Sequence, residues 1–241
     1  MKKFKYLGSI ISNDLKDDLE VGARIKAAGA AFASASKQFF ASKQIPLAHK
    51  KIAYEGLILS ILLFGSECWS LTANARRRLN SFHNRCVRQM CRISTWQQWK
   101  LHLHQHTMES RLDVKCLDSY LNRRRLGWAG HVVRMDYEKR LPRKLLSAWI
   151  DSKRPKGRPQ NGFAHALMTD ITNAGLDAFN WYTLAANQGK WEEFIGREDI
   201  HIASSADPQS IPQAPPAQDL RRSARIAPRP AQRALARRPP A

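Results

Sequence analysis

Residues 72–92, TANARRRLNSFHNRCVRQMCR, have the sequence pattern of an amphipathic helix. Their apolar side chains recur at helical spacing, which predicts a helix with one buried face; they are Leu79, Phe82, Cys86, Val87 and Met90. Thr72 is the expected N-cap. The other face carries arginines, with no acidic residue anywhere in 76–100; they are Arg76, Arg77, Arg78, Arg85, Arg88 and Arg92. The stretch therefore predicts a helix that packs on one side and presents positive charge on the other.

The flanking segments extend this helical pattern. Apolar residues at 21–39 recur every three or four positions, and the Ala and Gly among them would let a neighbouring helix approach closely. Residues 47–64 follow Pro46 and become almost wholly apolar, which predicts a buried central helix closed by Gly65. Ser110 is the expected cap of a further helix that runs through residues 123–125. Shorter helices are expected near 161–174 and 180–196; their core candidates are Trp181, Trp191 and Phe194.

The two ends of the chain differ from this pattern. Residues 4–11 are β-prone and predict a strand, or half of a hairpin whose partner lies on the N-terminal side. From Pro208 onward, proline, alanine and arginine dominate, which predicts disorder over about 203–241. The expected fold is mainly α: a helical bundle with a short N-terminal β strand or hairpin and a disordered basic C-terminal tail.

Charge is distributed unevenly along the 241 residues, whose net charge is +20. Residues 76–160 hold 21 basic and 6 acidic side chains, a net of +15, and residues 208–241 hold 7 and 1, a net of +6. Residues 161–207 hold 2 and 7, a net of −5. A basic block of this size favours a polyanionic partner, most often nucleic acid. No apolar stretch is long enough to cross a membrane. Four cysteines favour a reducing, intracellular location, and nucleic-acid binding favours the nucleus.

Six phrases, in this order, carry a resemblance to a known family. The series is similar to the C-terminal part of reverse transcriptases from non-LTR (LINE-type) retrotransposons. The resemblance spans about residues 4–196. The phrases are FKYLG at 4–8, RI at 24–25 before an Ala-rich segment, LFGSECW at 63–69, FHNRCVR at 82–88, LGWAGHVVRM at 126–135 and RPKGRP at 154–159.

The resemblance implies a division of the chain. It assigns the strand with Tyr6, Leu7 and Gly8 to the end of the palm, beside the primer terminus, and the following helices to the thumb that grips the template–primer duplex. The expected segments are a palm-end remnant at 1–13, a thumb-like helical domain at 14–108, a basic post-thumb helical region at 109–152, a basic Pro/Gly linker at 153–160, a small acidic helical segment at 161–202 and the tail at 203–241.

The resemblance also sets an expectation about activity. Polymerisation in the family needs a paired Asp-Asp upstream of this strand to hold two Mg²⁺ ions, and this sequence has no Tyr-x-Asp-Asp. Asp17 and Asp18 follow the strand instead of preceding it, so no catalytic role passes to them. We therefore expect a truncated fragment, without a catalytic site, cofactor or small-molecule substrate of its own, that does not polymerise alone. It should bind RNA, an RNA–DNA hybrid or DNA non-specifically.

Three basic segments are the candidate contacts. The arginine face at 76–92 comes first, because several neutralised phosphates give salt-sensitive affinity without sequence preference. The run Arg123, Arg124 and Arg125 is a weaker candidate, since acidic residues lie in the same region. The third segment comprises Lys153, Arg154, Lys156 and Arg158 and resembles the AT-hook core that lies in a narrow A·T minor groove. Lys156 stands where that motif has arginine. An alternative function follows from it: a chromatin-associated DNA-binding module.

Two further groups have a structural and a functional interpretation. Cys86, Cys91, His102 and His104 are weak candidates for a zinc site. On a helix, Cys86 and Cys91 would point about 140° apart, so buried thiols and surface imidazoles are the favoured interpretation. Trp96 and Trp99 lie beside Lys100 and could hold single strands by stacking, although tryptophans at helical spacing more often belong to a core.

Overall fold

The computed structural model describes residues 3–6, 8–12, 17–147, 162–177 and 180–196. Leu7, the AT-hook-like segment at 153–158 and the C-terminal tail at 203–241 lie outside the described residues. Helices form most of the described chain, which confirms the predicted mainly α fold. The main elements are β1 (Lys3–Tyr6), β2 (Ser9–Ser12), α1 (Asp18–Ala35), α2 (Leu47–Ala53), α3 (Ser60–Leu62), α4 (Ala73–Met90), α5 (Thr95–Lys100), α6 (Gln105–Leu112), α7 (Leu117–Val133), α8 (Leu141–Ser147), α9 (Phe163–Asn173), α10 (Trp181–Ala186) and α11 (Gln188–Gly196).

The N-terminal segment is a hairpin closed on itself. β1 and β2 are antiparallel, in a register that pairs Lys3 with Ser12 and Tyr6 with Ser9. The expectation of a partner strand on the N-terminal side was wrong for this pairing, because Gly8 takes a φ of +89°, which lets the chain turn back within the segment. Buried Glu20 accepts a hydrogen bond from the Ile10 amide at 2.6 Å and so attaches the hairpin to α1.

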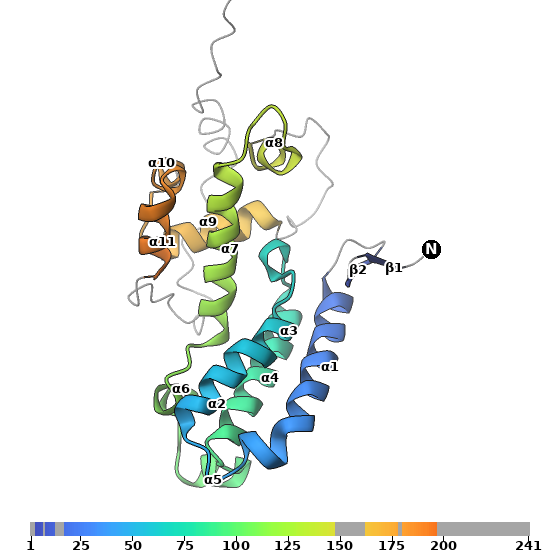
Figure 1. Cartoon of the computed structure of the whole chain (residues 1–241), viewed down its shortest axis with the longest axis vertical. Helices are drawn as coiled ribbons and strands as arrows, with labels where there is room; N and C mark the ends of the chain where they lie inside the picture. The colour runs from blue at the N-terminus through green and yellow to red at the C-terminus, as the bar shows by residue number, and fades with distance from the viewer. Residues whose placement is uncertain (1–2, 7, 13–16, 148–161, 178–179, 197–241) are drawn as a thin grey trace, which may run out of the picture.

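A first hydrophobic core lies among α1, α2, α3, α4 and α6 and the start of α7 (Figure 1). The apolar face predicted for residues 72–92 is buried in this core along α4. The Thr72 hydroxyl accepts a hydrogen bond from the Ala75 amide at 3.1 Å, which confirms the predicted N-cap.

The segment at 47–64 is helical but not fully buried. It runs through α2, a π-helical turn (η2, Tyr54–Leu59) and α3, and Gly65 ends it with a φ of +75°. Ile58 and Leu62 are buried, whereas 61% of Leu57 and 47% of Phe64 are exposed. The expectation of complete burial was wrong, because neighbouring elements cover only one side of the segment.

The helix expected from Ser110 through residue 125 is two helices. α6 contains Ser110 and ends at Leu112, because Asp113 adopts the left-handed conformation with φ +54°. α7 then begins at Leu117, after Cys116 in an extended conformation. A capping role for Ser110 was therefore a wrong prediction, since the residue lies inside α6. Leu112, Val114, Leu117 and Leu121, expected in the post-thumb region, pack in the first core.

A second core forms where the later half of α7 meets α9, α10 and α11 (Figure 1). Its buried members include Trp181, Trp191 and Phe194, as predicted. The Trp191 indole donates a hydrogen bond to the Leu126 carbonyl at 3.1 Å and lies directly against Gly130. α7 is thus shared by both cores, and the phrase LGWAGHVVRM at 126–135 forms much of the surface on which α10 and α11 dock.

Candidate nucleic-acid interface

Three of the predicted arginines line one surface hollow between α1 and α4. Arg77, Arg78 and Arg85 project from α4 and are exposed. The hollow has a volume of about 500 Å³, and its other lining residues are Ile25, Asn74, Ser81 and Phe82. No acidic side chain is in this lining, so the hollow concentrates positive charge over a partly apolar floor.

Small residues of α1 let α4 come close at this place. A Cβ added to Gly22 would lie 3.1 Å from the Arg78 guanidinium, and one added to Gly29 would lie 3.6 Å from the Phe82 ring. This confirms the close approach predicted from the Ala and Gly content of residues 21–39. The Arg85 guanidinium lies 5.4 Å from the centroid of the Phe82 ring, a cation–π distance. Among the described residues, no ion pair involves any of the three arginines that line the hollow.

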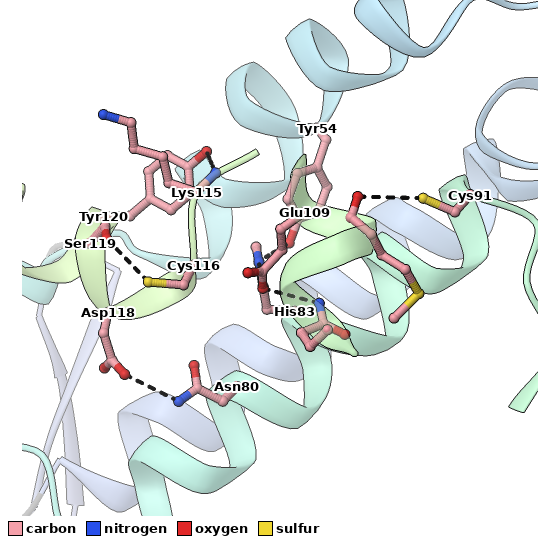
Figure 2. A network of polar contacts seen from close by, with 12 residues as sticks. Tyr54, Asn80, His83, Cys91, Glu109, Lys115, Cys116, Asp118, Ser119 and Tyr120 are labelled. Carbon is pink, nitrogen blue, oxygen red and sulfur yellow. Dashed lines mark hydrogen bonds and ion pairs between the residues drawn. The ribbon is translucent and has the colours of Figure 1, made fainter. Parts of the chain in front are cut away.

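The other predicted arginines divide into those that face solvent and those held by acids. Arg92 and Arg123 are exposed, and half-buried Arg88 donates to the Gln98 side chain at 3.4 Å. Arg76 pairs with Asp118 at 3.5 Å, where Asn80 also contacts Asp118 (Figure 2).

Two arginines of the run at 123–125 serve the fold. Arg124 pairs with Glu67 at 3.0 Å and donates to the Leu63 carbonyl at 3.2 Å, which ties α7 to the LFGSECW phrase. Arg125 is 1% exposed and forms an ion pair with Asp170 of α9. Burial raises the pKa of Asp170, and Arg125 opposes this rise. Arg125 therefore cannot reach a phosphate: the prediction for this residue was wrong because its acidic partner lies 45 positions along the chain.

The neighbouring carboxylates of Asp17 and Asp18 accept hydrogen bonds from other parts of the chain, and they do not converge on a metal site. Asp17 accepts a hydrogen bond from the Ser70 amide at 2.7 Å, and Asp18 accepts one from the Thr72 hydroxyl at 3.1 Å. Burial raises the pKa of Asp17. These contacts fix the start of α1 against the start of α4. The residues present do not fit the Mg²⁺ pair of a polymerase, which needs several converging carboxylates.

The candidate zinc ligands are apart from one another in the structure. Cys86 is buried in α4, and burial raises the pKa of its thiol to about 12. The Cys91 thiol donates to the Met108 carbonyl at 3.7 Å (Figure 2). His102 and His104 are exposed. Within the described ranges, no three His, Cys, Asp or Glu side chains are grouped closely enough to bind a metal ion.

One buried polar cluster escaped the sequence analysis. His83 is fully buried; its Nδ1 lies 2.8 Å from the Tyr54 hydroxyl and its Nε2 lies 3.7 Å from the Glu109 carboxylate (Figure 2). Burial raises the pKa of Glu109, but His83 and the hydrogen bond from Gln105 outweigh this effect and lower it. The cluster links η2 and α6 to the buried side of α4. Its only sequence signal was a histidine at an apolar position of the helical period.

The aromatic residues after α4 lie on the surface. Trp96 and Trp99 belong to α5 and are 61% and 73% exposed. The Lys100 ammonium lies 4.7 Å from the centroid of the Trp96 ring. The expectation that these tryptophans belong to a core is therefore wrong for Trp96 and Trp99.

Tyr6, predicted to be near a primer terminus, is exposed and stacks on Phe4 at a centroid distance of 6.4 Å.

Comparison with known proteins connects the chain to mobile elements. The sequence is 28% identical over 203 residues to a protein of Caenorhabditis elegans named as transposon-derived and uncharacterized. The match covers 81% of this chain and 70% of the relative, and it supports a transposon-related origin. No family model matches the sequence, and no solved structure matches it. Within the described residues, no helix has the length and apolar character needed to cross a membrane.

Proposed function

We propose that this chain is the C-terminal thumb and post-thumb part of a non-LTR retrotransposon reverse transcriptase, and that it binds RNA or an RNA–DNA hybrid without sequence specificity. The observation that carries the proposal is the hollow lined by Arg77, Arg78 and Arg85, from which acidic side chains are absent. The transposon-derived relative and the six ordered phrases support the parent enzyme.

The spacing of the three arginines suits a nucleic-acid backbone. Seven residues separate Arg78 from Arg85, which is about 10.5 Å along a helix that rises 1.5 Å per residue. A strand of duplex advances about 3.4 Å per phosphate, so the two guanidinium groups span roughly three phosphates. Arginine forks suit phosphate oxygens. Contacts of this kind position a duplex and carry no sequence information.

The neighbouring ion pairs favour the same surface. Arg76, Arg124 and Arg125 are already paired with Asp118, Glu67 and Asp170. A phosphate would have to displace these carboxylates, whereas it could bind the exposed arginines of the hollow without displacing an acidic side chain. Arg77, Arg78 and Arg85 on α4, with exposed Arg92 just after the helix, are therefore a part of the +15 of residues 76–160 that a phosphate can reach.

The test replaces the arginines of the hollow and measures equilibrium binding to a labelled RNA–DNA hybrid. The triple variant R77Q/R78Q/R85Q should weaken binding by at least ten-fold, because each lost phosphate contact also ends the release of condensed counterions. A matched control, K37Q/K43Q/R140Q, removes the same formal charge from exposed positions elsewhere and should retain most of the affinity.

Three results would contradict the proposal. The wild-type chain would bind no nucleic acid at moderate salt, both triple variants would weaken binding equally, or the isolated chain would extend a primer. A preference for A·T-rich over G·C-rich duplex would instead support the alternative module based on the segment at 153–158. A hybrid-binding thumb predicts no such preference.

A further inference from the structure

α5 carries two tryptophans, Trp96 and Trp99, that are not buried in either hydrophobic core. None of the residues of this six-residue helix is buried, although two of them are tryptophans. A tryptophan left in water forgoes the favourable burial of one of the largest apolar surfaces among side chains. Trp96 and Trp99 are three residues apart, so their side chains are neighbours on one helix face.

The exposed pair stands on a well-anchored helix. The Ser94 hydroxyl accepts from the Gln97 amide at 3.1 Å, and the Gln97 side chain accepts from the Ser94 amide at 2.8 Å, which together form a capping box. The Gln98 side chain donates to the Leu103 carbonyl and accepts from Arg88 at 3.4 Å, which joins α5 to the last turns of α4. The tryptophans are therefore presented in a fixed place, close to the arginine helix.

The charge around the pair is positive. Lys100 lies over the Trp96 ring, and Arg88 and exposed Arg92 lie between the arginine hollow and α5. The sequence has no acidic residue from 68 to 108. The next acid, Glu109, points to His83. Aromatic faces beside cations bind unpaired bases, because every base has a π face and every nucleotide brings a phosphate.

We propose that Trp96 and Trp99 form a stacking platform for unpaired nucleotides that continue a duplex held at the arginine hollow. This inference rests on the proposed function and deepens it: the ligand becomes a duplex with a single-stranded extension, of RNA or DNA. Arg77 and Met90, the last residue of α4, are 13 residues apart, about 20 Å along the helix. A backbone that follows α4 from the hollow therefore arrives at α5.

The experiment compares binding of a labelled oligouridylate strand with that of a blunt RNA–DNA hybrid of the same length. Trp96→Ala/Trp99→Ala should weaken single-strand binding by about 5-fold to 150-fold, the range expected from the loss of one stacked base. Hybrid binding should change less than about two-fold. Trp96→Phe/Trp99→Phe keeps the rings and should retain most of the affinity. Both double variants alter the same two exposed residues, and circular dichroism checks that each variant folds.

Leu101→Ala is the matched control. Leu101 is 62% exposed in the same segment and has no aromatic face, so its loss should leave single-strand binding unchanged. Equal binding by the wild type and the Ala pair would overturn the inference, as would an equal loss on strand and hybrid, or a loss in Leu101→Ala as large as in the Ala pair. If R77Q/R78Q/R85Q weakens hybrid binding while the Ala pair changes nothing, the platform fails and the proposed function stands.

Discussion

Two glycines of α7, three residues apart, should respond oppositely to the same substitution. A Cβ at Gly130 would lie 2.1 Å from Nε1 and 2.3 Å from Cδ1 of Trp191, whereas a Cβ at Gly127 would meet nothing within 4 Å. Ordinary contact begins near 3.4 Å, so Gly130→Ala must displace the indole or the helix by at least 1.3 Å. Gly127→Ala introduces a better helix former at no steric cost.

The structure sets the size of each effect. Displacing Trp191 removes its hydrogen bond to the Leu126 carbonyl, about 1 kcal/mol. It also weakens the packing of a buried tryptophan. Complete removal of such a side chain costs about 3–5 kcal/mol, and we assign roughly half of that cost, about 2 kcal/mol, to the displacement. The gain in helix propensity returns about 1 kcal/mol. Gly130→Ala should therefore lower the free energy of unfolding by about 2 kcal/mol, and Gly127→Ala should raise it by about 1 kcal/mol.

Urea denaturation measures these changes, and amide hydrogen exchange locates them. In Gly130→Ala, exchange should accelerate in α10 and α11, which dock on α7, while the amides of α1 and α4 stay protected. If Gly130→Ala proves as stable as Gly127→Ala, the packing of Trp191 on α7 is wrong, and with it the structural role given to the LGWAGHVVRM phrase.

Three further predictions concern buried and exposed groups. Asp170→Asn leaves the Arg125 guanidinium buried without its partner and should cost about 3–5 kcal/mol in urea denaturation; a change under 1 kcal/mol would contradict the pair. The pKa of Glu109 is lowered from its ordinary value of 4.5, so the ionised carboxylate stabilises the folded protein above that pH. This stabilisation is lost as the pH falls through the folded-state pKa. Glu109→Gln should flatten that acid limb of the stability curve, and an unchanged limb would exclude this role. A thiol reagent should modify exposed Cys116 long before Cys86, whose pKa is about 12, as mass spectrometry of native protein would show; equal rates would contradict the burial.

Local signals in the sequence were sufficient for the mainly α fold class and for the two faces of α4. The period of residues 72–92 fixes which face of α4 is buried, and the Thr72 cap depends on an amide only three positions away. Gly65 ends its helical segment by backbone conformation alone. Such features need no knowledge of the tertiary structure, so residue pattern predicts them well.

Features that depend on distant partners could not be read in this way. A basic run looks the same whether its arginines meet solvent or, like Arg125, a carboxylate 45 residues away. The exposure of Trp96 was likewise hidden, because helical spacing predicts a shared face but not whether another element covers it. His83 had the period of a core residue, and only the fold supplies its contacts with Tyr54 and Glu109.

The salt dependence of hybrid binding shows whether the arginine hollow contacts the nucleic-acid backbone. A plot of log affinity against log salt has a slope of about −0.9 for each phosphate neutralised on a duplex. If Arg77, Arg78 and Arg85 each contact one phosphate, R77Q/R78Q/R85Q should have a slope shallower than wild type by about 2.7. Parallel lines for wild type and variant would contradict the account, because the hollow would then take no part in holding nucleic acid.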